Sequence, residues 1–184
     1  MGFLASRSVA AVVAILAAFL PAGAHAQPTT EVDVKAAFLY NFTKFVAWPQ
    51  PGAPAEPFRL CVVSDEALRR SLERTIEGEN VNGRPLQSLV PHTPEEARGC
   101  QMLFVRHADG NREEQLLAAV RDLPVLTISD TTDFARRGGG IEFVLENNRL
   151  RFDVNVPGAE RAGIKVSSRL LKVARRVHES PAKK

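Results

Sequence analysis

Three polar pairs follow the most strand-like apolar runs of the chain: Ser64-Asp65, Arg106-His107 and Ser129-Asp130. If those runs are parallel strands, the pairs meet at the carboxyl edge of one sheet, where α/β proteins usually bind ligands. Two carboxylates, an imidazole and a guanidinium at one edge could bind a small anion or transfer protons. A structural interpretation explains the same residue types and is favoured: Ser64, Asp65 and Asp130 are helix caps, and Arg106-His107 is a solvated turn. The rim formed by these six residues is therefore a candidate ligand site with a structural alternative.

A second group of candidate residues lies near the C-terminus. The pattern over 167–177 predicts a helix with apolar residues on one side and a basic stripe, Arg169, Lys172, Arg175 and Arg176, on the other. Surface helices commonly carry such charges on the solvated side, and this is again the favoured interpretation. The alternative is a docking face for an acidic partner or for anionic lipid headgroups.

Other kinds of site find little support. The chain has no G-x-S-x-G elbow and no Walker A motif, and its glycine triplet at 138–140 does not fit G-x-G-x-x-G, so the triplet favours a turn or close packing. The histidines are scattered, which predicts no metal site, and a formal charge of +3 is too small for a nucleic-acid binder. We expect no catalytic residues and no cofactor. A hydrolase built from residues distant in sequence is the third alternative, because triads are recognised by geometry.

The first 26 residues have the pattern of a secretory signal peptide. Arg7 is the only lysine or arginine before Lys35, residues 9–20 are all apolar, and Ala24-His25-Ala26 forms a cleavage motif. The apolar run is too short to span a bilayer, and no later run approaches that length. The sequence therefore predicts export, a mature chain without a membrane span, a folded domain at 27–178 and a polar tail at 179–184.

Export determines how the two cysteines are interpreted. Cys61 and Cys100 are the only cysteines of the chain, and each lies beside an apolar, strand-like run. In an oxidising compartment such a pair is expected to form a disulfide. A reactive thiol would need an activating base, and neither cysteine has a histidine or lysine next to it in sequence.

The elements that must position these residues follow from periodicity and turn chemistry. Apolar runs predict strands at 58–63, 102–105 and 125–128, and helical spacing predicts helices at 31–47, 66–76, 113–121 and 167–177, with Asp130 capping a further short helix. Asn82-Gly83 and the segments 141–145 and 150–154 indicate hairpins. Strands that are apolar throughout and alternate with helices require a sheet covered on both faces. The predicted fold is a single-domain α/β sandwich with a mostly parallel central sheet, flanking helices and a late antiparallel hairpin.

Several segments, taken together and in order, resemble the YfiR-like (HmsC-like) family of periplasmic proteins. They are VKAAFLYNFTKFV at 34–46 with Trp48-Pro49, PVLTISD at 124–130, FARRGGGIEFVLENNRLRFDVN at 134–155, Ala162-Gly163-Ile164, and SSRLLKVAR at 167–175. Any one of these motifs alone would be weak, but the set covers nearly the whole predicted mature chain.

The resemblance implies a periplasmic protein without catalytic activity. Such proteins bind the periplasmic sensor region of an inner-membrane diguanylate cyclase and repress it, which lowers cyclic-di-GMP and restrains biofilm formation. Homodimers and a redox-sensitive disulfide also belong to the family, and Cys61 and Cys100 match its shared cysteine pair; the second pair of some relatives is missing here. The alternative function is a periplasmic small-molecule-binding or sensing module that uses the rim.

Overall fold

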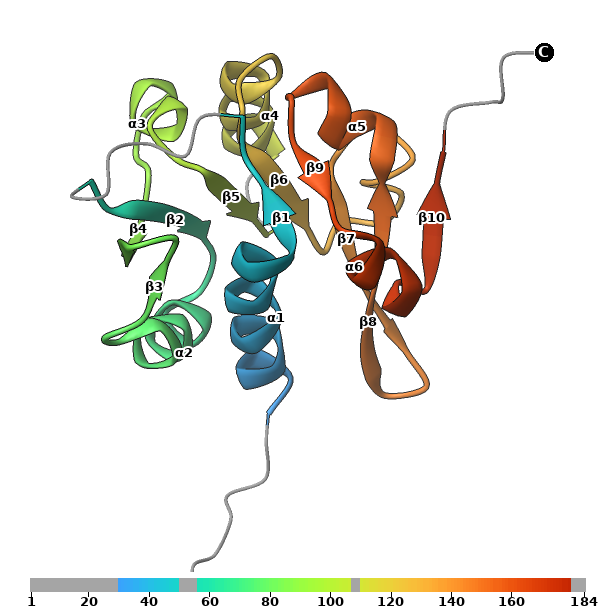
Figure 1. Ribbon diagram of the computed structural model, residues 1–184, viewed down its shortest axis with the longest axis horizontal. Helices are drawn as coiled ribbons and strands as arrows, with labels where there is room; N and C mark the ends of the chain where they lie inside the picture. The colour runs from blue at the N-terminus through green and yellow to red at the C-terminus, as the bar shows by residue number, and fades with distance from the viewer. Residues whose placement is uncertain (1–29, 50–55, 107–109, 180–184) are drawn as a thin grey trace, which may run out of the picture.

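An eight-stranded sheet forms the centre of the fold (Figure 1). The computed structural model describes residues 30–49, 56–106 and 110–179, so the predicted signal peptide, His107 and residues 180–184 of the predicted tail lie outside the described residues. The elements in chain order are α1 (Glu31–Phe45), β1 (Val46–Ala47), β2 (Phe58–Val63), α2 (Glu66–Ile76), β3 (Asn80–Val81), β4 (Arg84–Leu89), α3 (Pro94–Arg98), β5 (Met102–Val105), α4 (Gly110–Val120), β6 (Leu126–Ser129), β7 (Ile141–Glu146), β8 (Arg149–Asn155), α5 (Val156–Arg161), β9 (Lys165–Val166), α6 (Ser168–Val173) and β10 (Arg176–His178).

The sheet is mostly parallel, and its strands lie in the order β10-β8-β7-β6-β5-β2-β4-β3. The five strands from β4 to β7 in that order run parallel to one another, and β8 returns antiparallel to β7 in a hairpin. A separate pair, β1 and β9, joins the beginning of the described chain to its last quarter. The predicted α/β class, with flanking helices and a late antiparallel hairpin, is therefore correct.

Helices cover the two faces of the sheet, and in Figure 1 α1 and α2 lie below it while α3 and α4 lie above it. The larger apolar cluster lies between the sheet and the α1–α2 layer, where it includes Leu39 and Phe42 of α1 and Phe104, Phe143 and Phe152 of the strands. A smaller cluster lies under α3 and α4. The alternation of side chains along each strand assigns one set to each layer, as in a sheet that is buried on both faces.

Local chemistry explains where several elements begin. Thr30 and Asp33 form a capping box at the start of α1, and the Asp65 carboxylate accepts a hydrogen bond of 3.0 Å from the Leu68 amide at the start of α2. Asn82 and Gly83 both have positive φ, 52° and 78°, which is the turn that a two-residue β3–β4 hairpin requires.

The structure differs from two predicted elements and adds two helices. The first helix ends at Phe45 instead of Ala47, because Val46 and Ala47 pair with β9. The residue run that follows Asp130 forms turns rather than the predicted helix. Two short helices that were not predicted, α3 and α5, begin at the caps Thr93 and Asn155.

The predicted helix over 167–177 is wrong beyond Val173. The chain leaves the helix at Ala174, the Arg175 amide donates to the Phe152 carbonyl at 2.8 Å, and residues 176–178 add β10 to the free edge of β8. The helical spacing of the apolar residues was real, but pairing with β8 also satisfies the backbone groups at the edge of β8, which a continued helix would leave unpaired. The four basic residues therefore do not form one stripe on a helix.

Candidate functional site

The strand-end rim comes together at one edge of the sheet, as predicted. The register aligns Val63, Val105 and Ser129, so the ends of β2, β5 and β6 are neighbours. There the Arg106 guanidinium donates to the Asp65 carboxylate, whose other oxygen caps α2. Both side chains of this ion pair are almost half exposed. Asp65 therefore serves as a cap and ion-pair partner, as the structural interpretation of the rim requires.

Asp130, the second carboxylate of the rim, forms an ion pair with a lysine from α1. The Lys35 ammonium lies 2.8 Å from Asp130 and 3.0 Å from Glu31, and the Lys35 residue is only 9% exposed. Burial by itself would lower the pKa of Lys35, but the hydrogen bonds to Asp130 and Glu31 outweigh it and raise that pKa above its usual value. This buried cation fixes the start of α1 on the sheet edge, a role that the sequence reasoning did not assign to Lys35.

The hydroxyl groups of the rim differ in their contacts. The Ser129 hydroxyl donates to the Thr131 hydroxyl at 2.8 Å and accepts from the Thr131 amide, so it closes the turn after β6. The Ser64 hydroxyl is buried and has no hydrogen-bond partner among the described residues. The charges of Asp65, Arg106 and Asp130 are paired within the protein, so the described part of the rim offers no unpaired acid or base for proton transfer.

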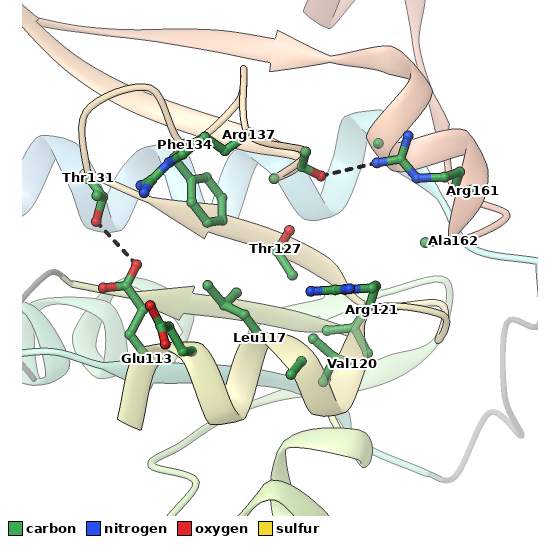
Figure 2. Close-up of a pocket in the computed structure, with 16 residues that line it drawn as sticks. Glu113, Leu117, Val120, Arg121, Thr127, Thr131, Phe134, Arg137, Arg161 and Ala162 are labelled. Carbon is green, nitrogen blue, oxygen red and sulfur yellow. Dashed lines mark hydrogen bonds between the residues drawn. The ribbon is translucent and has the colours of Figure 1, made fainter. Parts of the chain in front are cut away.

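A cavity of about 560 Å³ opens on the other part of the sheet, between α4, β6, the turns after Ser129 and α5 (Figure 2). It is lined by apolar side chains, by three arginines and by two glutamates: Leu117, Val120, Val125 and Phe134; Arg121, Arg137 and Arg161; Glu113 and Glu114. Figure 2 shows Arg121 and Arg161 toward one end and Glu113 with Thr131 toward the other. The sequence reasoning did not find this site, because its residues come from separate segments.

Buried polar side chains fix one wall of this cavity, formed by the turns after Ser129 and the start of α5, on the sheet. The Glu142 carboxylate accepts hydrogen bonds of 3.1 Å from the amides of Asp133 and Ala135. The Asn155 amide group donates to the Ala135 carbonyl at 2.8 Å and accepts from the Gly158 amide at 3.0 Å. Buried acceptors and donors are costly unless they are paired, so these bonds fix the turns and the start of α5 relative to β7 and β8.

The glycine triplet allows the cavity wall to pack closely. A Cβ atom on Gly139 would overlap the Phe134 ring, and one on Gly140 would come within 2.9 Å of the Thr127 carbonyl oxygen. Gly138 has a φ of +108°, which side chains rarely adopt. The expectation of a turn or close packing at 138–140 is therefore correct, although the sequence did not connect the triplet with this cavity.

The disulfide belongs to an apolar cluster that also contains part of the cavity lining. Cys61 of β2 and Cys100, just before β5, are joined with their Cα atoms 5.9 Å apart, and both are buried under α3 and α4. The same apolar cluster contains Val120 and Val125, which also line the cavity. The bond therefore ties together the part of the sheet on which α4 rests.

The C-terminal basic residues have two different environments. Arg175 donates to both carboxylate oxygens of the buried Asp153, at 2.8 and 2.6 Å, and this hydrogen bonding raises its pKa further above the usual range. Arg169, Lys172 and Arg176 are exposed. Only these three remain available for the predicted docking face.

A comparison with protein families identifies a match over most of the described chain. The YfiR/HmsC-like family matches residues 32–175, which include α1 from its second residue onward and every element from β1 to α6. The chain belongs to the YfiR/HmsC-like family. Membership implies a periplasmic regulator of cyclic-di-GMP signalling, in a family known as regulatory and not as catalytic. In the residues that the structure describes, no helix of this YfiR/HmsC-like protein is long and apolar enough to cross a membrane, and no group of three His, Cys, Asp or Glu side chains could hold a metal ion.

Proposed function

We propose that this protein binds the periplasmic sensor region of an inner-membrane diguanylate cyclase and represses the enzyme. The family match over residues 32–175 is the observation that carries this proposal. The pairing of the described rim charges is consistent with it, because a repressor of this kind needs a contact surface and no acid–base site. Repression would lower cyclic-di-GMP and reduce biofilm formation.

Repression by binding requires a preference for one state of the cyclase. A ligand with equal affinity for the active and inactive conformations would shift nothing, however tightly it binds. The repressor must therefore bind the inactive conformation of the sensor region more strongly. A signal that weakens the repressor, or removes it, would then release the enzyme.

The surface around α6 is the contact face that we propose. Val173 is 60% exposed, an unusual exposure for a large apolar side chain in this structure, and it lies at the end of α6 next to Lys172. Arg169 and Arg176 add exposed positive charge nearby in sequence. An apolar residue among cations suits an acidic partner surface with an apolar centre, since charge steers association and apolar contact supplies affinity.

Cells that carry the cognate cyclase can test the contact face. The double change Arg169→Glu and Lys172→Glu should raise cyclic-di-GMP and abolish capture of the cyclase from membranes, with no change in the unfolding midpoint. Arg98→Glu is the matched control, because Arg98 is an exposed arginine on α3, across the sheet from α6. Full repression by the double variant would refute this face, and failure of the unmodified protein to capture any diguanylate cyclase would refute the function. Capture of a second copy of the chain alone would indicate that the face is a homodimer interface.

The disulfide offers a second test of the same function. Replacing Cys61 and Cys100 by serine should lower the melting temperature and relieve repression, because the bond supports the sheet from which the contact face is built. Unchanged repression together with an unchanged melting temperature would rule out this role.

A further inference from the structure

We propose that the cavity between α4 and α5 binds a small organic anion, an oxyanion group on an apolar body. The proposal concerns a ligand site and does not depend on the identity of the protein partner. Its residues lie on the face of the sheet opposite α1 and α2, whereas the candidate rim lies at the carboxyl edge of the strands.

The size and lining of the cavity suit a small molecule. A volume of about 560 Å³ falls within the range of known small-molecule sites, roughly 300–1,000 Å³. Leu117 and Val120 of α4 lie on one side, and the buried Phe134 lies on the other. Val125, at the start of β6, completes the apolar part of the lining. These four side chains can cover the apolar body of a ligand.

The arginines of the lining have donor groups that the protein itself uses poorly. Arg161 makes one long contact, 3.4 Å from its Nη2 to the Gly138 carbonyl, and Arg137 makes a similar one of 3.4 Å to Thr132. Arg121 is exposed, and no side-chain hydrogen bond or ion pair is seen for it within the described part of the chain. Arg175 shows the contrast, since its bonds to Asp153 are 2.8 and 2.6 Å.

The charge distribution, with Arg121, Arg137 and Arg161 against Glu113 and Glu114, favours an anion. Arg121 and Arg161 lie toward the end of the cavity away from Glu113, and Arg121 points inward in Figure 2. Glu113 is buried and accepts a hydrogen bond of 3.2 Å from the Thr131 hydroxyl, so its carboxylate already has a protein donor. A guanidinium binds a carboxylate or phosphate through paired N–H groups, with planar geometry that favours oxyanions over other acceptors. We therefore place the oxyanion between Arg121 and Arg161, with the apolar body toward Phe134.

Calorimetry with three probes tests the ligand class on protein purified from the periplasm. The probes are 2-naphthoate, its neutral match 2-naphthamide, and inorganic phosphate, which carries charge without an apolar body. We expect 2-naphthoate to bind at least tenfold more tightly than either of the other two. Equal affinity for the acid and the amide would overturn the role of the arginines, and absence of binding by every probe at millimolar concentration would overturn the site. Tighter binding of phosphate than of 2-naphthoate would overturn the requirement for an apolar body.

Variants locate the binding in the cavity. Arg121→Gln and Arg161→Gln should each raise the dissociation constant of 2-naphthoate about tenfold, because each removes a charged donor from the oxyanion. Arg136→Gln is the matched control, since Arg136 is exposed, adjacent to Arg137 and outside the lining. Ala118→Trp should abolish binding, because Ala118 is an exposed residue of α4 that lines the cavity, so the new side chain can fill the space without entering the core. An Arg121→Gln or Arg161→Gln affinity that matches the Arg136→Gln value would refute the assignment even if the Ala118→Trp variant failed to fold.

Discussion

Arg175 and Arg176 are neighbours in sequence, and their replacement should have very different effects on stability. Arg175 makes a two-bond ion pair with Asp153, whose side chain is only 2% exposed, and a longer contact of 3.6 Å with Glu146. Arg176 is exposed, and its side chain has no hydrogen-bond or ion-pair partner among the described residues. Changing Arg175 to Met would keep most of the chain length of the side chain and remove its charge. The Asp153 carboxylate would then be left buried beside His178 without its main partner.

The expected cost follows from the burial of that carboxylate. Removing one partner of a fully buried ion pair costs about 3–5 kcal/mol. The Arg175 side chain is 24% exposed, so water can replace part of the lost interaction and the lower end, about 3 kcal/mol, applies. In a domain of this size that loss lowers the melting temperature by roughly 6–12 °C. Arg176→Met, as an exposed substitution, should change stability by less than about 0.5 kcal/mol.

Urea denaturation followed by circular dichroism measures both variants under the same conditions. The urea midpoint should fall for Arg175→Met while the slope of the transition stays constant, because unfolding exposes the same surface area in both proteins. Adding Asp153→Asn to Arg175→Met should recover part of the loss, since the uncompensated charge is then removed. Equal losses for the two arginine variants, or a double variant less stable than Arg175→Met, would refute this account of the C-terminal segment.

Three further predictions concern other parts of the fold. Breaking the Cys61–Cys100 bond, which spans 39 positions, should cost about 4 kcal/mol of unfolding free energy, and a reduced protein that unfolds at the same urea concentration as the oxidised one would contradict this. The hydrogen bond from Ser71, followed by those from Thr30, lowers the pKa of Asp33 below 3.8, so Asp33 stabilises the fold above about that pH and loses this effect as the pH falls through its folded pKa. The stability difference between the protein and its Asp33→Asn variant, measured by thermal unfolding, should therefore shrink in strong acid, and a constant difference would argue against it. Gly139→Ala should lower the free energy of unfolding by about 1–3 kcal/mol, because the added Cβ overlaps the Phe134 ring. A second substitution that replaces Phe134 by a smaller residue should reduce that loss in the same denaturation assay.

Much of the fold was predictable because its signals are local. The Asn82-Gly83 turn and the start of the first helix at residue 31 depend on residues within a few positions of each other, and both occur where the sequence indicated. The apolar strands β2 and β5 were equally clear, since a strand buried on both faces has to be apolar throughout. The short helix α3 was missed because five residues are too few for a helical period to be recognised.

The candidate sites were predictable only in part. The described rim residues do lie at one sheet edge, as the sequence predicted, but no residue near Asp130 in sequence indicated that Lys35 would pair with it. Arg121, Arg137 and Arg161 come from α4, a turn and α5, so their approach to one cavity could not be inferred from spacing. The basic residues at the end of the chain were assigned to one helix because their spacing is helical over that short range.

The amino-acid sequence alone determined the class of the fold, its predominantly parallel strands, the pairing partners available to its two cysteines and the likeness to a periplasmic regulator. These depend on composition and on interactions between residues near one another in the chain. Tertiary structure decided that the chain after Ala174 pairs with β8, that Arg175 neutralises Asp153, and that three arginines share a cavity. The physical reason is that each of these features depends on contacts between residues far apart in sequence. Pairing a buried charge or a strand edge outweighs the weak preference of a few residues for a helix.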